Sequence, residues 1–389
     1  MNTQIKNEFV QTLYLLRKDI VSLRSLTSMD TEVLTRFGKP SVSILLFLIS
    51  MAMKKSIIVF FIYISTILMS LAQQTLLLTK YTFTDAQPLV WEITGGQTYT
   101  LTGADASLFK IKDRNELVFI GKANNRKWYD LTIKSSGRKT DVRIVKDEFN
   151  RNGVIAHRGA WKASQTPQNS LASLQEAIKL GCYGSEFDVH MSADLGLFVN
   201  HDPHYQEVTI EKTSSDQLKA LKLSNGESLP TLEAYLAAGL TQNHTRLILE
   251  IKTSIISKER SMALTEKVVK LVQAMKAQGW VDYIAFDYEV CLKVKQLDPY
   301  ATVTYLNGDK MPEALAADHL NGLDYHFSVI KKHEDWISQA HQHKLTVNVW
   351  TANEPDLLQW LLDKKVDYIT TNEPESLFKI KAQNTSGNN

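Results

Sequence analysis

Apolar and polar positions alternate with two different rhythms along the chain. From residue 74 to about 147 the apolar runs are short and alternating or β-branched, and turn residues such as Gly95-Gly96 separate them. This spacing predicts a small β-sandwich of six or seven strands. The expected strands are Leu76–Leu78, Leu89–Ile93, Tyr99–Leu101, Leu117–Ile120, Tyr129–Ile133 and Val142–Val145.

From residue 149 to 383 apolar strands alternate with amphipathic helices. Eight such strands in strict alternation predict an α/β fold of the (β/α)8 TIM-barrel type. A doubly wound sheet is the alternative, but no glycine-rich phosphate loop follows the first strand. The expected strands are Gly153–His157, Gly184–Val189, Arg246–Ile251, Tyr283–Phe286, Thr302–Leu306, Gly322–Phe327, Thr346–Trp350 and Asp367–Thr370. The expected helices include Ser170–Leu180, Lys258–Gln278, Tyr288–Leu297, Glu334–His343 and Asp356–Lys364.

The segment before the sandwich has the pattern of a signal peptide. In residues 53–72, Lys54 and Lys55 precede a short apolar run, and Ser70 and Ala72 supply small residues for cleavage before Gln73. The run is short for a membrane span. We therefore expect an exported protein, periplasmic or secreted, with no stable span in the mature chain.

Residues 1–52 fit poorly before a signal peptide, because they hold a second short apolar run, Ile44–Met53. The favoured interpretation is a mis-assigned or disordered extension, with Met53 as the true start. The alternative is a protein tethered to the membrane. The accessory domain is expected at 73–148, the barrel at 149–383 and a disordered tail at 384–389.

The composition of the chain does not favour a nucleic-acid partner or a disulfide framework. The 44 basic and 42 acidic side chains give a net charge of +2, with no basic block, so a nucleic-acid partner is not expected. The two cysteines, Cys182 and Cys291, do not make a disulfide framework or a metal-binding spacing.

Polar residues concentrate where the predicted strands end. Glu186 and Asp188 end the second strand on one side of it, since side chains alternate with a period of two, and Glu250 ends the third. Charge inside a barrel is costly unless it is paired or bound to metal. Three carboxylates at one mouth suit a hard divalent cation such as Mg²⁺ or Ca²⁺.

Histidines and basic residues flank this predicted metal site. His157 and His201 could act as acid and base, because the pKa of histidine lies near neutrality. Arg158 and Lys252 supply positive charge that a phosphate group would need. Metal, acid, base and basic residues together indicate cleavage of a phosphoester.

The same residues carry a resemblance to a known family. The run VIAHRGAWKASQTPQNSLASLQEAIKLGCYGSEFDVHMSADLGLFVNHD (154–202) resembles the opening of the glycerophosphodiester phosphodiesterase family, and LEIK (249–252), VWT (349–351) and YITTNEPE (368–375) resemble its later motifs. The resemblance implies a TIM barrel with an insertion after the second strand. The stretch His204–Leu229 has the place and length of that insertion.

The resemblance also implies roles for single residues. His157 and His201 match the general acid–base pair, and Glu186, Asp188 and Glu250 match the ligands of the divalent cation. Two further positions, Arg158 and Lys252, match residues that contact phosphate, and Trp350 matches one that lines the substrate pocket. One position departs from the family pattern: Gln168 stands in PQNS, where a glutamate is usual.

The implied activity is metal-dependent hydrolysis of a small glycerophosphodiester to sn-glycerol 3-phosphate and an alcohol. One alternative is a phospholipase D-like activity on lysophospholipids, although His204–Leu229 has no strongly apolar lip. The other is a non-catalytic binding protein in which the β-domain acts. Within that domain Leu101–Phe119 resembles the middle of cadherin-like repeats, without their acidic calcium motifs, and is expected to be an accessory module.

Overall fold

The computed structural model describes residues 75–86, 89–122 and 125–386. The expected extension 1–52, the signal peptide 53–72 and its cleavage site lie outside these residues. No helix among the described residues is long and apolar enough to cross a membrane. Residues 75–389 form one compact unit, which holds a β-sandwich and a barrel.

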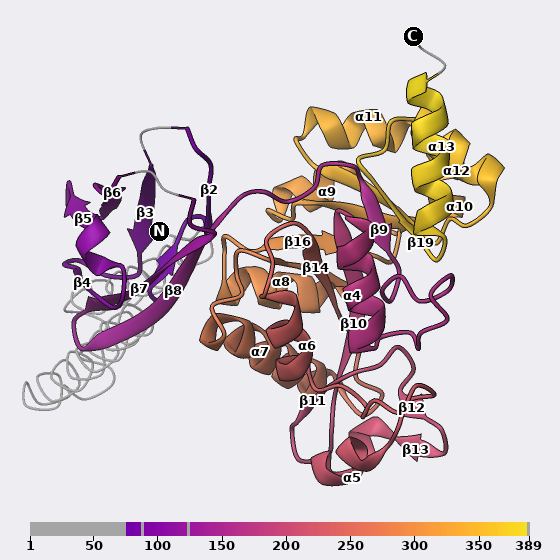
Figure 1. Cartoon of the computed structure of the whole chain (residues 1–389), viewed down its shortest axis with the longest axis horizontal. Helices are drawn as coiled ribbons and strands as arrows, with labels where there is room; N and C mark the ends of the chain where they lie inside the picture. Colours follow the sequence, from indigo (N-terminus) through magenta and orange to yellow (C-terminus); the bar gives the residue numbers. More distant parts are fainter. Residues whose placement is uncertain (1–74, 87–88, 123–124, 387–389) are drawn as a thin grey trace, which may run out of the picture. The chain divides into compact units, whose positions relative to one another are not determined.

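The first region is a sandwich of two four-stranded sheets, as expected, and it has eight strands (Figure 1). Aromatic side chains from both sheets fill its core, including Trp91, Phe109 and Tyr129. Two short strands, β2 and β5, were absent from the prediction. One sheet runs in the order β1 (Leu77–Leu78), β3 (Val90–Thr94), β6 (Glu116–Phe119), β5 (Phe109–Lys112), and the other runs β2 (Thr82–Phe83), β8 (Arg138–Lys146), β7 (Trp128–Ser135), β4 (Thr100–Thr102). A short 3-10 helix, η1 (Ala106–Leu108), precedes β5.

The second region is a closed barrel of eight parallel strands, which confirms the predicted fold. The last strand pairs with the first, Thr370 with Ile155, so the sheet has no open edge there. All eight predicted strands are present, and two have the predicted bounds. In spatial order they are β9 (Val154–Ala156), β10 (Gly184–Met191), β14 (Arg246–Ile251), β15 (Val281–Ala285), β16 (Thr302–Tyr305), β17 (Gly322–His326), β18 (Thr346–Trp350) and β19 (Tyr368–Thr371).

Amphipathic helices cover the outside of the barrel (Figure 1). Several begin at side-chain caps; for example, Ser170 accepts a hydrogen bond from the backbone N–H of Ser173 and Gly181 ends the same helix in a left-handed conformation. The helices are α4 (Leu171–Leu180), α6 (Leu232–Gly239), α7 (Lys258–Ala274), α8 (Tyr288–Leu297), α9 (Pro312–Ala317), α10 (Phe327–Lys332), α11 (Asp335–Gln342), α12 (Pro355–Asp363) and α13 (Pro374–Ser386). Helix α13 extends into the segment expected as a disordered tail.

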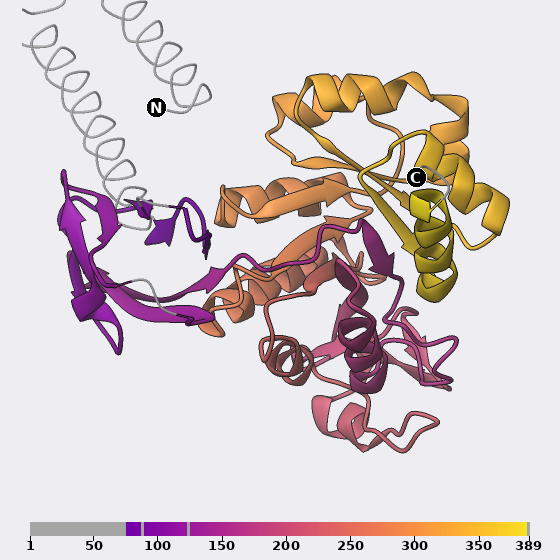
Figure 2. The ribbon, with the colours of Figure 1, turned by 45° about the horizontal axis from the view of Figure 1, so that its top comes forward.

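The stretch after β10 departs from the simple strand–helix repeat. Strand β11 (Leu197–Val199) returns antiparallel to β10, and the expected insertion follows. It projects from the barrel in both ribbon views (Figures 1 and 2). Its apolar side chains, among them Ile210 and Leu218, are buried in a cluster of their own. The insertion contains β12 (His204–Tyr205), β13 (Val208–Thr209), the 3-10 helix η2 (Ile210–Lys212) and α5 (Ser215–Ala220).

Candidate active site

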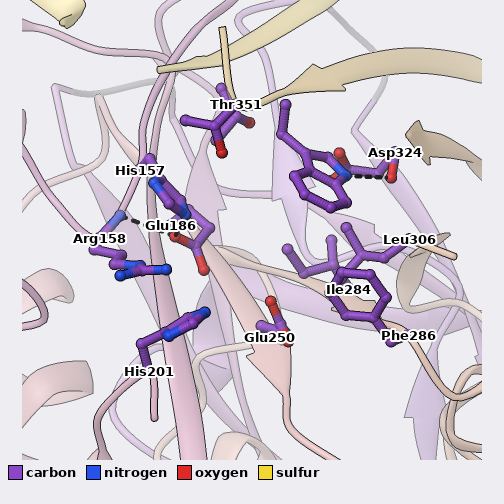
Figure 3. Close-up of a pocket in the computed structure, with 12 residues that line it drawn as sticks. His157, Arg158, Glu186, His201, Glu250, Ile284, Phe286, Leu306, Asp324 and Thr351 are labelled. Carbon is purple, nitrogen blue, oxygen red and sulfur yellow. Dashed lines mark hydrogen bonds and ion pairs between the residues drawn. The ribbon is translucent and has the colours of Figure 1, made fainter. Parts of the chain in front are cut away.

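A cavity opens at the carboxyl ends of the barrel strands, the end at which TIM-barrel enzymes place their chemistry. Its apolar residues lie on one side, and its charged residues, apart from Asp324, lie on the other (Figure 3). The charged side consists of His157, Arg158, Glu186, His201 and Glu250. The opposite side consists of Ile284, Phe286, Leu306, Asp324 and Trp350, and Thr351 and Thr370 complete the lining.

Three buried carboxylates meet at the charged side. Glu186 and Asp188 lie two residues apart on β10, and the register of the sheet pairs Asp188 with Glu250 of β14. One oxygen from each residue lies within 4.8 Å of the others, and the three side chains are buried. A set of carboxylate oxygens this close together matches the ligands of a hard divalent cation. These residues therefore fit a metal site.

The basic side chains near this cluster balance its negative charge only in part. Burial raises the pKa of Glu186 well above its usual value, and Asp188 and Glu250 add to the shift. Burial and the neighbouring Asp188 raise the pKa of Glu250 to about 8, although Lys252 opposes them. The pKa of Asp188, in contrast, is lowered, because Lys252 and other neighbours outweigh the effect of burial. Glu186 and Glu250 are thus held where their ionised forms are unfavourable, and a bound cation would reverse that preference.

Lys252 lies behind the carboxylates and does not line the cavity. Its Nζ is 2.7 Å from Glu250 Oε1 and 3.2 Å from Asp188 Oδ1. Burial alone would lower the pKa of Lys252, but these two carboxylates raise it to about 12. The lysine is therefore charged and held against two of the three predicted metal ligands.

His157 follows β9 directly and is fixed from two sides. Its backbone N–H donates to the carbonyl of Thr371, and its Nδ1 is 2.8 Å from Oδ1 of Asn372. Because an amide oxygen only accepts, the proton of a neutral His157 lies on Nδ1. Its other nitrogen, Nε2, is 3.9 Å from Glu186 Oε2 and is free to take a proton.

Burial lowers the pKa of His157 to about 4, and the charge of Arg158 adds to the shift. The imidazole is therefore neutral at neutral pH.

His201 is more exposed and has a carboxylate partner. Its Nδ1 is 2.7 Å from Oδ1 of Asp202, and 37% of its side chain is accessible. Burial lowers the pKa of His201, and Asp188 opposes the shift. The buried His190 lies 3.1 Å from the carbonyl oxygen of His201 through its Nε2 and supports the backbone there. The two histidines thus approach the same cavity with different partners.

Arg158 reaches the cavity from a strained turn. Its φ is +58°. Gly159 beside it has φ +80°, and a Cβ at that position would also meet Ser173 of α4 at 2.4 Å, so both the conformation and the space require glycine. The turn lets the Arg158 N–H donate to Glu186 Oε2 at 2.9 Å. The guanidinium Nη1 donates to Oε1 of Gln168 at 2.6 Å, so the residue that departs from the family pattern contacts a predicted phosphate-binding residue.

Trp350 ends β18 and lies on the apolar side of the cavity. Its ring centroid is 5.5 Å from that of Phe286, and the two planes are nearly perpendicular. Its indole N–H donates to the backbone carbonyl of Asp324 at 2.8 Å. This bond fixes the indole against β17, and Ile284 and Leu306 pack with it.

Comparison with known proteins agrees with this geometry. Residues 157–376, more than half of the 389-residue chain, match the model of the glycerophosphoryl diester phosphodiesterase family. The chain belongs to this family. The protein is therefore an enzyme of the glycerophosphodiester phosphodiesterase type, a phosphoric diester hydrolase.

Individual relatives lead to the same family. A glycerophosphodiester phosphodiesterase from Caldanaerobacter subterraneus is 25% identical over 58% of this chain and 96% of its own. The crystal structure of a glycerophosphodiester phosphodiesterase from Parabacteroides distasonis is 41% identical, covers 61% of this chain and 99% of its own, and has a TM-score of 0.59.

A second solved structure shows the shared fold only. A phosphodiesterase from Oleispira antarctica, solved with the product sn-glycerol 3-phosphate, is 24% identical and covers 59% of this chain and 96% of its own, with a TM-score of 0.51.

The phosphodiesterase has further polar residues at this site that the sequence did not single out. Asn169 donates through Nδ2 to Asp188 Oδ2 at 2.9 Å and accepts from the Asp188 N–H. Asn372 holds His157, and Asp324 lines the cavity. Asn169 lies in the family motif PQNS and Asn372 in YITTNEPE, so these motifs could have pointed to both residues. Asp324 had no comparable signal.

Proposed function

We propose that the enzyme hydrolyses glycerophosphodiesters to sn-glycerol 3-phosphate and an alcohol with the help of a divalent cation. The observation that carries this proposal is the convergence of His157, His201 and three buried carboxylates on one cavity. Glu186, Asp188 and Glu250 would hold Mg²⁺ or Ca²⁺. A cation bound there supplies positive charge that stabilises the charge developing on the phosphate oxygens.

The two histidines divide the proton transfers in this proposal. His157, neutral and held by Asn372, takes a proton from the nucleophile through Nε2. His201 is the general acid: it gives a proton to the oxygen of the departing alcohol, and Asp202 stabilises its imidazolium form. A P–O bond to the nucleophile forms, the P–O bond to the alcohol breaks, and each histidine regains its starting state after proton exchange with water.

Two nucleophiles fit this scheme, and they predict different intermediates. Water gives sn-glycerol 3-phosphate directly. The neighbouring glycerol hydroxyl would first give a cyclic phosphate, which water then opens. Arg158 faces the cavity and would contact the phosphate oxygens, while Lys252 adds positive charge from behind the carboxylates.

The first test is release of sn-glycerol 3-phosphate from glycerophosphocholine and glycerophosphoinositol by the purified protein, with Mg²⁺ or Ca²⁺ and with EDTA. We expect release that needs the cation and falls by roughly a thousandfold or more in His157→Ala. Asn372→Ala keeps the imidazole but removes its partner, so we expect a smaller loss, mainly in kcat. Absence of release from both diesters with either cation would contradict the proposal.

A second candidate function, hydrolysis of lysophospholipids, has an observation in its favour. The insertion buries its apolar residues, but three neighbouring strand–helix loops at the mouth of the barrel expose theirs. Ile255 and Ile256 follow β14, Phe286 follows β15 and Met311 follows β16; their exposed fractions range from 37% to 53%. Such a rim could contact an acyl chain. The test is turnover of lysophosphatidylcholine against glycerophosphocholine, and Ile256→Ser should lower only the former.

A further inference from the structure

The apolar side of the cavity contains one buried carboxylate that the proposed chemistry does not use. Asp324 is the third residue of β17, and its side chain points into the barrel. It is 2% exposed and yet lines the cavity (Figure 3). Its Oδ1 accepts no hydrogen bond. A buried polar atom without a partner is costly, so its retention calls for a ligand or a structural reason.

The neighbours of Asp324 leave its negative charge without an opposite charge. In the described part of the chain no lysine, arginine or histidine forms an ion pair with it, whereas Asp188, Asp282 and Glu211 each have a basic partner. Burial raises the pKa of Asp324 to about 7, and only the amide of Asn348 opposes the shift. Asn348 thus forms a hydrogen bond with the carboxyl group, and its amide also donates to Thr370 Oγ1 at 2.9 Å.

Apart from Asn348 and Thr370, the groups around this carboxylate are largely apolar and aromatic. Ile284 and Leu306 lie beside Trp350 in one cluster, and the ring of His326 is 5.1 Å from that of Trp350. Aromatic faces attract cations, and the attraction is stronger where water is excluded. A carboxylate within such a wall is complementary to a positively charged group that also carries methylene or methyl groups.

We propose that this side of the cavity is the alcohol subsite and that Asp324 selects diesters whose alcohol is a positively charged amino alcohol. The inference rests on the proposed function, because it places the phosphate at the carboxylates and histidines and the departing alcohol opposite them. Ethanolamine and choline share the required chemistry. Ethanolamine would donate to the free Oδ1, and choline would offer a diffuse charge to the carboxylate and to the indole of Trp350.

The test uses each cationic substrate with an uncharged partner of the same shape. Glycerophosphoethanolamine is paired with the propanol diester, and glycerophosphocholine with the 3,3-dimethylbutanol diester. The readout is the ratio of kcat/KM within each pair, which cancels changes in the amount of folded enzyme. We expect the wild-type protein to favour at least one cationic member by about tenfold or more, the usual effect of a charge-assisted contact away from bulk water.

Asp324→Asn should bring this ratio down about tenfold, towards one. Glu313→Gln is the matched control, because it removes a negative charge from an exposed position in the first turn of α9, and it should keep the wild-type ratio. A wild-type ratio near one in both pairs would overturn the inference without any variant. The inference would also be overturned if the enzyme preferred a diester whose alcohol is the uncharged glycerol over the cationic diesters and lost that preference in Asp324→Asn. If none of the diesters is cleaved, the proposed function itself fails.

Discussion

The two ends of the barrel interior treat buried charge in opposite ways. Both ends use strand β14, which begins at Arg246 and carries Glu250 four residues later on the same face. At the amino end, Arg246 Nη1 lies 3.3 Å from Asp282 Oδ1, and the guanidinium lies 4.5 Å from the ring of Phe149. At the carboxyl end Glu250 meets two further carboxylates. The amino end holds one carboxylate and one guanidinium, whereas the carboxyl end holds three carboxylates against two basic side chains, Lys252 and Arg158.

The neighbours of each carboxylate account for this difference. Burial raises the pKa of Asp282, and Arg246 opposes that shift. Burial also raises the pKa of Glu186, but there Asp188 and Glu250 increase the shift. A protein that needed only stability would not keep three carboxylates together. The contrast indicates that the amino end serves folding and the carboxyl end serves a ligand.

Glu186→Gln should give the largest effect on activity. It should also distinguish a role in ligand binding from a role in folding. The amide can still accept the hydrogen bond from the Arg158 N–H but loses a charged ligand atom, so we expect kcat/KM with the cation to fall roughly a thousandfold. In EDTA the free energy of unfolding should stay level or rise by about 1 kcal/mol, because repulsion among the carboxylates is relieved. Steady-state kinetics and thermal unfolding in EDTA measure the two effects. A clear loss of stability would show that Glu186 is structural.

Asp282→Asn should give the opposite result at the amino end. It leaves the largely buried Arg246 side chain, which is 16% exposed, without its carboxylate, and we expect a loss of about 3 kcal/mol in the free energy of unfolding. Urea denaturation measures this loss.

Activity per folded molecule should change little, because Asp282 does not line the cavity. The double variant Arg246→Met with Asp282→Leu should recover part of the stability, since it leaves no unpaired charge. A double variant less stable than Asp282→Asn would contradict this account.

Much of the barrel and of its charged site could be predicted from the sequence. The strict alternation of strands and helices fixes the fold, and the period of two at a strand end places Glu186 and Asp188 on one side. The sandwich was predicted less completely. β2 has only two residues, and the alternation in β5 is too short to stand out from the turns around it.

Contacts that depend on closure of the barrel could not be predicted. Asn372 and His157 are 215 residues apart, and they meet only because β19 pairs with β9. In the sequence Asp324 is a single acidic residue in the middle of the short strand GLDYH, and no motif distinguishes it. Its meaning depends on its depth in the barrel and on the lack of a basic partner, and neither is visible in a one-dimensional pattern.

Gln168→Glu should give the smallest effect on the kinetics. It tests whether the charge next to Arg158 at the mouth of the cavity affects substrate binding. It places a carboxylate at the end of the Arg158–Gln168 hydrogen bond, which neutralises part of the positive charge that faces the phosphate. Because the pair is exposed, the interaction is worth no more than about 1 kcal/mol, and we expect KM for glycerophosphocholine to rise about threefold with kcat nearly constant. The increase should fade in high salt, where exposed charges are screened.

Gln165→Glu is the matched control for this last change. It adds the same charge to the same loop at an exposed position, whereas the hydrogen bond to the Arg158 guanidinium comes from Gln168, and it should leave KM within error of the wild-type value. If both variants raise KM equally, the effect comes from net charge and not from Arg158. A fall in KM in Gln168→Glu alone would show that a carboxylate at this position helps to hold Arg158 or the cation, and that the glutamine of PQNS weakens the site.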